Sequence, residues 1–155
     1  MQQKINGNMA DLLKLENQIC FPVYSLAKEI TNQYRTFLNK IDLTYPQYLV
    51  MLVLWEYKEQ TVTNIGDKLR LDSGTLTPLL KRLEQKGLVS RSRSTSDERV
   101  VNITLTKAGE ELKAKVKNLP KNMMASLQLP MEELKALKES VERILKIIYQ
   151  KNENT

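Results

Sequence analysis

The 155-residue chain contains no histidine and only one cysteine, Cys20. Without histidine, neither a Ser–His–Asp triad nor a Cys–His pair can form. One cysteine cannot form a disulfide within the chain, and the absence of Cys–His clusters argues against a zinc site. A thioredoxin-like βαβ order and a C-x-x-C motif are also missing. We therefore expect no metal, no cofactor and no enzymatic activity.

Long apolar runs are missing as well. The longest, from Tyr48 to Trp55, is far shorter than the roughly 20 residues that a membrane-spanning helix needs. No positively charged start is followed by an apolar run, so we expect no secretory signal. Hydrophobic residues make up 41% of the chain, enough for one folded domain, residues 1–155, without disulfides. We expect a cytoplasmic protein in a reducing compartment, without a membrane partner.

The charge balance is moderately basic. Lysine and arginine number 24 against 18 acidic residues, which gives a net charge of +6. Such a surplus favours a polyanionic partner such as nucleic acid, although a lysine-rich soluble surface would give the same count.

Most of the chain has the apolar spacing of helices. Near the N-terminus, apolar residues recur at intervals of three and four, as on one helical face: Leu15, Ile19, Val23, Leu26 and Ile30. Pro22 interrupts this face. It either kinks the helix or lies in the first turn of a helix that restarts there.

Helix-capping signals divide the middle of the chain. Thr44 and Gln47 have capping-box spacing around Pro46, and a buried helix should follow. A short helix from Thr61 is predicted to be capped near Thr63.

The next helix is predicted to be capped by Asp72 or Ser73 and to end at Gly87. Two β-branched stretches, 88–94 and 99–106, then predict a β-hairpin around a polar loop. Thr106 should cap a further helix, and Pro120 and Pro130 punctuate the chain before a long amphipathic helix. Its predicted apolar stripe comprises Leu134, Leu137, Val141, Ile144 and Ile148.

This order, long helix, helix, short helix, helix, hairpin and two helices, predicts a mainly α fold with a small β-hairpin wing. Residues 44–106 would form a winged helix-turn-helix. Its recognition helix needs one apolar face for its own domain and one polar face for the major groove. The apolar face would hold Leu76, Leu79, Leu80 and Leu83, and the candidate DNA contacts are Ser73, Thr75, Thr77, Lys81 and Arg82.

The hairpin would supply further DNA contacts. Arg91 and Arg99 flank its loop, and Asp97 lies where it could orient the Arg99 guanidinium. An arginine at a wing tip suits the narrow minor groove of A·T-rich double-stranded DNA. Taken singly, each of these residues could equally be part of an ordinary exposed polar face.

Longer motifs resemble a known family. The segments DSGTLTPLLKRLEQKGLVSR and DERVVNITLTKAGEEL are similar to the core of MarR-type transcriptional regulators. KLENQICF and LTYPQYLVMLVLWE resemble the one-cysteine OhrR-type sensors of organic hydroperoxides. The resemblance implies a homodimer, intertwined through helices within 8–40 and 107–152. It also implies a repressor that leaves a pseudo-palindromic operator when it is oxidised.

By default, a single cysteine such as Cys20 is a small buried hydrophobic residue. Tyr24 lies one helical turn away from it. The resemblance implies that Cys20 is the redox sensor and that tyrosines of the partner subunit, at the positions of Tyr34 and Tyr45, donate hydrogen bonds to its thiolate. Tyr34 cannot reach its own Cys20, because fourteen helical residues span about 21 Å.

Oxidation of Cys20 by an organic hydroperoxide would give a sulfenic acid. That acid could form a mixed disulfide with a low-molecular-weight thiol, cyclise to a sulfenamide or overoxidise. Pro22 departs from the aliphatic residue expected two positions after the sensor cysteine.

A repressor released by a small aromatic ligand, without redox chemistry, is the alternative. Trp55, Tyr48, Met51 and Arg35 could line its pocket.

Overall fold

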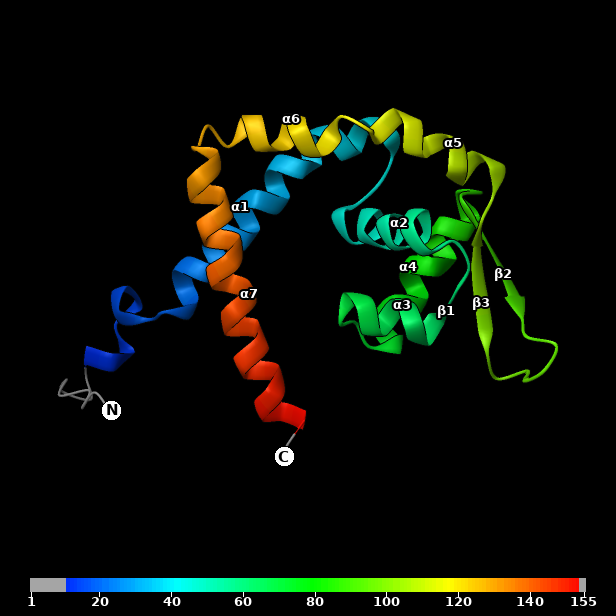
Figure 1. Cartoon of the computed structure of the whole chain (residues 1–155), viewed down its shortest axis with the longest axis horizontal. Coiled ribbons are helices and arrows are strands. Elements are labelled where there is room, and N and C mark those ends of the chain that lie inside the picture. The colour runs from blue at the N-terminus through cyan, green and yellow to red at the C-terminus, as the bar shows by residue number, and fades with distance from the viewer. Residues whose placement is uncertain (1–10, 154–155) are drawn as a thin grey trace. The chain divides into compact units, whose positions relative to one another are not determined.

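The computed structural model describes residues 11–153 (Figure 1). The chain divides into two compact units, one up to Leu119 and one from Pro120. Residues 8–10 of the predicted dimerisation segment and both ends of the predicted domain lie outside the described residues. Within residues 11–153, none of the helices has the length and apolarity to cross a membrane.

The elements follow one another in the predicted general order. The helices are α1 (Cys20–Leu38), α2 (Tyr45–Tyr57), α3 (Val62–Leu69), α4 (Ser73–Gln85), α5 (Lys107–Val116), α6 (Leu119–Ser126) and α7 (Met131–Glu153). The strands are β1 (Gln60–Thr61), β2 (Val89–Arg93) and β3 (Val101–Leu105), and short 3₁₀ helices occupy Asp11–Leu13, Leu15–Asn17 and Asn39–Ile41.

The N-terminal helix begins at Cys20 rather than kinking at Pro22. α1 begins at Cys20, so Pro22 lies in its first turn. The amide hydrogens of a first turn have no partner within the helix, and a proline there loses no hydrogen bond. Leu15 lies in a separate 3₁₀ helix and Ile19 caps α1. The predicted stripe is therefore wrong for its first two members.

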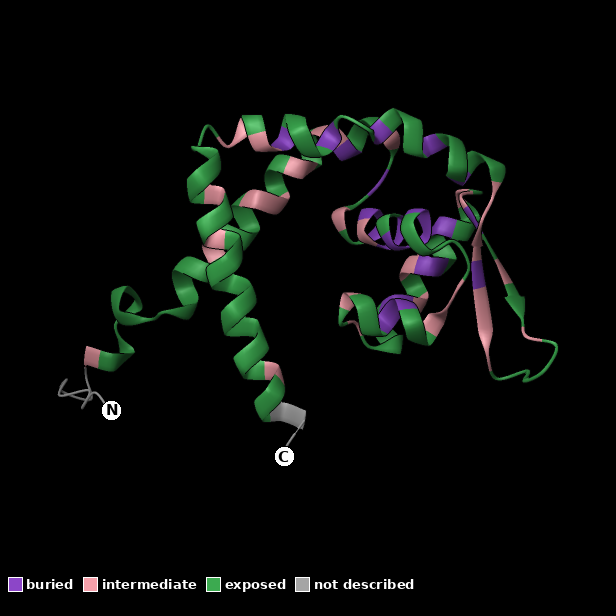
Figure 2. Ribbon diagram, in the orientation of Figure 1, coloured by how far each residue is buried: buried purple, intermediate pink, exposed green. Residues whose placement is uncertain are grey.

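α2 forms the centre of the first unit. Its capping box is present as predicted: the Thr44 side chain accepts from the Gln47 amide at 3.4 Å, and the Thr44 amide donates to Gln47 Oε1 at 3.0 Å. The part of α2 that follows the cap carries apolar residues on nearly every side. Its buried apolar residues are Tyr48, Val50, Met51, Val53, Leu54 and Trp55, and they give α2 the concentration of buried positions visible in Figure 2.

The short helix α3 starts earlier than predicted. Its cap is Thr61, whose side chain accepts from the Asn64 amide at 3.1 Å, and not Thr63. Thr61 has the extended backbone that a capping residue needs, since it also ends β1. That strand pairs Gln60 with Ile103 of β3, and at two residues it is too short to give an alternating sequence pattern.

The recognition helix and the wing agree with prediction. Asp72 caps α4 through the Thr75 amide at 2.8 Å, and Gly87 takes the left-handed conformation, φ 68°, just beyond its end. β2 and β3 pair antiparallel from Val89↔Leu105 to Arg93↔Val101, and the sheet order is β1-β3-β2. Thr106 caps α5 by accepting from the Gly109 amide at 3.1 Å.

Three helices, and not two, follow the wing. α5 belongs to the core of the first unit: Leu112 and Val116 are buried, and Trp55 donates to the Gly109 carbonyl at 2.9 Å. Pro120 lies in the first turn of α6, just after the break between α5 and α6. In the second unit, α7 carries its predicted apolar residues on largely exposed positions. The predicted division into a core of 44–106 and two dimerisation segments stays a prediction.

Candidate nucleic-acid interface and thiol site

The recognition helix α4 has the two faces that its sequence predicts. Leu76, Leu80 and Leu83 are buried, and Leu79 is half-buried. These leucines fix the helix against α2 and α3, so its other face is held outward. On that outward face Ser73, Thr75, Lys81 and Arg82 are exposed and Thr77 is half-buried.

The N-terminus of α4 is ordered by its capping carboxylate. Asp72 Oδ1 accepts from the Thr75 amide, and Asp72 Oδ2 accepts from the Thr75 hydroxyl, both at 2.8 Å. These hydrogen bonds lower the pKa of Asp72 below its ordinary value. The Thr75 hydroxyl proton is thus engaged within the helix, while its oxygen lone pairs stay available to accept a bond from a base edge.

The helix and the wing share a cleft of about 300 Å³. Ser73 and Thr77 line it from α4, while Arg91 and Arg99 line it from the hairpin. Four of the predicted DNA contacts, from two separate sequence regions, therefore lie around one concave surface. A hydroxyl-lined and arginine-lined hollow of this kind suits a phosphate or a base edge.

The wing tip holds Arg99 in a defined direction. Asp97 Oδ1 accepts from the Arg99 backbone amide at 3.0 Å and from Arg99 Nε at 3.3 Å. The predicted contact between these two residues is present. Because the Arg99 side chain is 92% exposed, most of its guanidinium donors face solvent. Asp97 thereby orients an exposed cation at the wing tip.

A second cleft, of about 480 Å³, lies between the C-terminal half of α4 and β2. Lys81, Arg91 and Arg93 bring three cations to it. Arg91 Nε lies 3.8 Å from a carboxylate oxygen of Glu84, which fixes the arginine between the two clefts. Arg93 was not among the predicted site residues, although its place in the alternation Arg91–Ser92–Arg93 puts it on the same strand face as Arg91.

The single cysteine is not a core residue. Cys20 is exposed at the first position of α1, which is contrary to the ordinary behaviour of a free cysteine. Tyr24, one turn further along the helix, is 65% exposed. The described chain therefore presents the thiol and one phenol together on an open helical surface.

The other two predicted tyrosines form a cluster on the first unit. The ring centroids of Tyr34 and Tyr45 lie 4.8 Å apart, and Tyr48 lies 5.9 Å from Tyr34. Burial, with the neighbouring Tyr45 and Tyr48 phenols, raises the pKa of Tyr34 to about 12. Like an ordinary phenol, its hydroxyl is protonated at neutral pH and can donate a hydrogen bond. Tyr48 was not predicted for this cluster, yet its three-residue spacing from Tyr45 on one helix indicates it.

The cluster and the thiol lie at opposite ends of one helix. α1 is continuous from Cys20 to Leu38, so Tyr34, fourteen positions after Cys20, lies about 21 Å from it along the helix. One protomer therefore cannot bring Tyr34 to its own thiol.

The predicted ligand-pocket residues mostly fill the core. Tyr48, Met51 and Trp55 are 2%, 0% and 5% exposed. Trp55 packs edge-on against Tyr48 at 6.3 Å and donates to the Gly109 carbonyl. Arg35 is exposed. Tyr48, Met51 and Trp55 therefore belong to the packed core of the first unit, and Arg35 does not.

Known proteins share this sequence and fold. The family model of the transcriptional regulator SarA/Rot matches residues 32–116. The organic hydroperoxide resistance transcriptional regulator of Bacillus subtilis (strain 168) is 48% identical over 145 residues, which are 94% of this chain and 99% of that protein.

Solved structures of AbfR, from Staphylococcus epidermidis, are also similar. Reduced AbfR bound to DNA is 41% identical, with a TM-score of 0.74 over 90% of this chain and 96% of that one. Overoxidized AbfR bound to DNA is 39% identical, with a TM-score of 0.73 over 90% of this chain and 98% of that one. The Bacillus subtilis relative is a transcriptional regulator by name, and two of the AbfR structures contain DNA.

Proposed function

Because the chain belongs to the MarR family of transcriptional regulators, and within it to the OhrR-type organic-hydroperoxide regulators, we propose that it is a peroxide-released repressor. The reduced homodimer binds its operator, Cys20 is the sensor, and oxidation of Cys20 releases the DNA. A repressor works where the chromosome lies, so we place the protein in the cytoplasm.

The observation that carries the sensor assignment is the separation of the thiol from the tyrosine cluster. Cys20 is exposed, and the protonated Tyr34 hydroxyl is held beside Tyr45 about 21 Å along the same helix. In a twofold dimer in which α1 of one protomer crosses α1 of the other, the Tyr34–Tyr45 cluster of one protomer lies beside the thiol of the other. Phenol hydroxyls that donate to a thiolate stabilise the charged, nucleophilic form.

The chemistry begins when the Cys20 thiolate attacks the terminal oxygen of an organic hydroperoxide. An S–O bond forms and the O–O bond breaks. The sulfur is oxidised to a sulfenic acid, and the peroxide leaves as an alcohol after it takes up a proton. A small thiol can then displace the hydroxyl as water to form a mixed disulfide. Since overoxidized AbfR has been solved on DNA, we assign release to the bulk of the mixed disulfide and not to added oxygen alone.

DNA binding rests on the two clefts beside α4. Ser73, Thr75, Thr77, Lys81 and Arg82 face the major groove, and Arg91 contacts a phosphate from the base of the wing. Arg99, oriented by Asp97, enters the adjacent minor groove. In a twofold dimer the two recognition helices read half-sites about one helical turn of DNA apart, and both must be engaged for tight binding.

The test is fluorescence anisotropy on DNA from upstream of the gene. Wild-type protein and Cys20→Ser are compared when reduced, with cumene hydroperoxide alone, and with cumene hydroperoxide plus a small thiol. We expect wild type to lose affinity at least about tenfold with peroxide and thiol, and Cys20→Ser to stay bound. Mass spectrometry should find the mixed disulfide on Cys20.

Two outcomes would contradict the proposal. If both proteins stay bound, peroxide is not the signal. If both are released alike, the signal does not pass through Cys20. Arg99→Ala serves as a control for the DNA contact, and it should lower operator affinity by about 1–3 kcal/mol without changing the peroxide response.

A further inference from the structure

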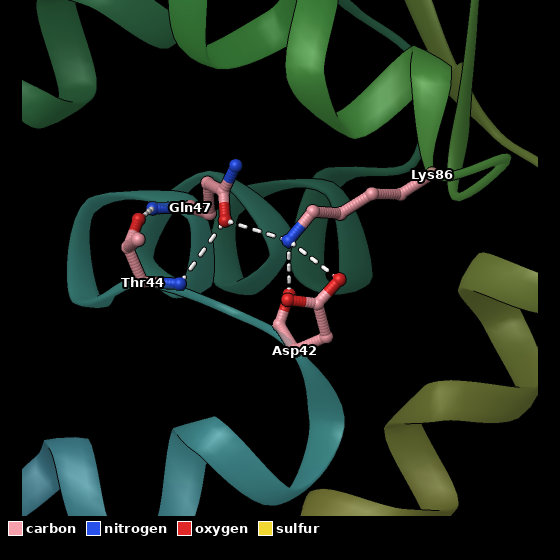
Figure 3. A network of polar contacts seen from close by, with 4 residues as sticks. All are labelled: Asp42, Thr44, Gln47 and Lys86. Atoms are coloured by element: carbon pink, nitrogen blue, oxygen red, sulfur yellow. Dashed lines mark hydrogen bonds and ion pairs between the residues drawn. The ribbon is translucent and has the colours of Figure 1, made fainter.

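Lys86 forms an unusual set of contacts at the C-terminal end of the recognition helix (Figure 3). It is the C-cap residue of α4, and its side chain reaches back to the segment just before α2. Lys86 Nζ lies 3.0 Å from Asp42 Oδ2 and donates to the backbone carbonyl of Asp42 and to Gln47 Oε1, the latter at 3.5 Å. The three donors of the ammonium therefore meet three acceptors on one short segment.

The acceptors belong to a rigid junction. Asp42 has a left-handed backbone, φ 52°, between the 3₁₀ helix that continues α1 and the capping box of α2. Gln47 is 2% exposed, and its Oε1 also accepts from the Thr44 amide. Lys86 thus bonds to the same amide oxygen that completes the α2 cap.

This junction lies next to the tyrosine cluster. Tyr45 is the first residue of α2, directly after the capping residue Thr44, and its ring packs 4.8 Å from that of Tyr34. Because Tyr45 is the first residue of α2, a backbone shift at Tyr45 would move the α2 N-terminus and, with it, the oxygen of Gln47. The Lys86 contacts connect that displacement to the last residue of the recognition helix.

We propose that Lys86 is a positioning residue that couples the thiol-supporting tyrosines to the recognition helix. It contacts neither DNA nor the thiol in this role. It holds the end of α4 to the α1–α2 junction, so that a change at Tyr45 alters the position of α4. The inference rests on the proposed function, since it names the connection through which oxidation of Cys20 acts on DNA binding.

The ion pair itself is not a strong stabilising contact. The Asp42 side chain is 87% exposed, and an ion pair so open to water adds little to stability. The leucines of α4 already anchor that helix in the core. What Lys86 adds is a specific link between two elements that otherwise meet through apolar contacts.

The experiment uses the full-length dimer and compares operator affinity in the reduced and mixed-disulfide states. The measured quantity is the dissociation constant in the mixed-disulfide state divided by that in the reduced state. Lys86→Met keeps most of the side-chain volume and removes all three donors, whereas Asp42→Asn removes only the ion pair. Lys40→Met is the matched control, because it removes an exposed lysine charge near the same junction.

We expect Lys86→Met to bind the operator within about threefold of wild type when reduced. Its ratio should fall by roughly 2- to 30-fold, the range seen for substitutions that alter coupling between sites. Asp42→Asn should lower the ratio by less, Lys86→Arg should restore most of it, and Lys40→Met should leave it unchanged. Mass spectrometry should find the same extent of Cys20 modification in every variant.

The wild-type arm separates the two hypotheses. If wild type is not released on oxidation, the proposed function fails. If wild type is released and Lys86→Met keeps the full ratio, the coupling role is refuted. A Lys86→Met protein that binds no DNA when reduced would also refute it, since Lys86 would then serve binding itself. Should that variant not fold, Asp42→Asn decides: an unchanged ratio there overturns the proposal.

Discussion

α2 and α7 are both rich in apolar residues, yet the first buries them and the second does not. In α2, Val50, Met51 and Leu54 are fully buried against other elements of the same unit. In α7, Ile144 and Ile148 are 53% and 48% exposed. The apolar residues of α7 lie on one stripe, whereas those of α2 surround the helix. α2 therefore buries its apolar residues within the first unit, whereas the apolar stripe of α7 stays largely exposed.

α1 combines both situations along its length. Its first half presents Phe21, Val23 and Leu26 to solvent, while Phe37 and Leu38 at its end pack into the core. Figure 2 shows this change from exposed to partly buried positions along the helix. Exposed apolar faces of this size are typical of surfaces that associate. We expect the homodimer to cover these faces, which the single chain leaves exposed.

Removal of a core side chain from α2 should have the largest effect on stability. Leu54→Ala should lower the free energy of unfolding by about 2–5 kcal/mol, because it leaves a cavity among side chains that cannot fully collapse. Chemical denaturation would measure the loss. It should be of similar size at high and low protein concentration, since the cavity lies within one protomer.

Leu52→Ala is the matched control on the same helix. Leu52 is 39% exposed, so its removal should cost much less than that of Leu54. Equal losses for the two leucines would show that burial does not decide how much an apolar residue of α2 contributes to stability.

The corresponding test on α7 should affect assembly more than folding. Ile144→Lys places a charge on the exposed apolar stripe and should weaken dimerisation at least about tenfold, or about 1.4 kcal/mol. The effect stays moderate because a lysine can extend its ammonium toward water. Sedimentation equilibrium would measure the dissociation constant, and circular dichroism would show whether the helices are retained.

Glu139→Gln is the control for this variant, because it changes the net charge by the same amount on the opposite side of α7. It should leave the dimer intact. A monomeric Glu139→Gln protein, or a fully dimeric Ile144→Lys protein, would show that the stripe is not the interface.

The two regions also differ in how well the sequence predicts them. In the winged helix, Thr44, Asp72, Gly87 and Thr106 have side-chain or backbone requirements that act within a few residues, and each lies where its pattern indicates. The errors there are small. The cap is Thr61 and not Thr63, because the two-residue strand β1 ends at Thr61. That strand pairs with residues about forty positions away, and such pairing leaves no local signal in the sequence.

Contacts between distant residues leave little signal in the local sequence. The packing of Tyr48 beside Tyr34, and the reach of Lys86 to Asp42, depend on how α1, α2 and α4 meet. The exposure of Cys20 is a similar case, because its default as a cysteine is burial. The resemblance to a family, and not the local pattern, marked it as functional.

Tyr34 lies where α1 passes from its exposed half to the core, and its ionisation should give the smallest effect of the series. Its pKa is raised from 10.0 to about 12 in the fold, so the unfolded chain releases this proton first as the pH rises. Folding stability is therefore unaffected by Tyr34 below pH 10 and declines between about pH 10 and 12.

Tyr34→Phe removes this group, and its free energy of unfolding should fall less than that of wild type between pH 9 and 11. Since the phenol is only half-buried, solvent keeps the difference modest. Denaturant titrations at the two pH values would measure it. Parallel losses in both proteins would mean that the Tyr34 hydroxyl is open to water, and the hydrogen-bond donor proposed for the thiol of the partner subunit would then be no better ordered than the exposed phenol of Tyr24.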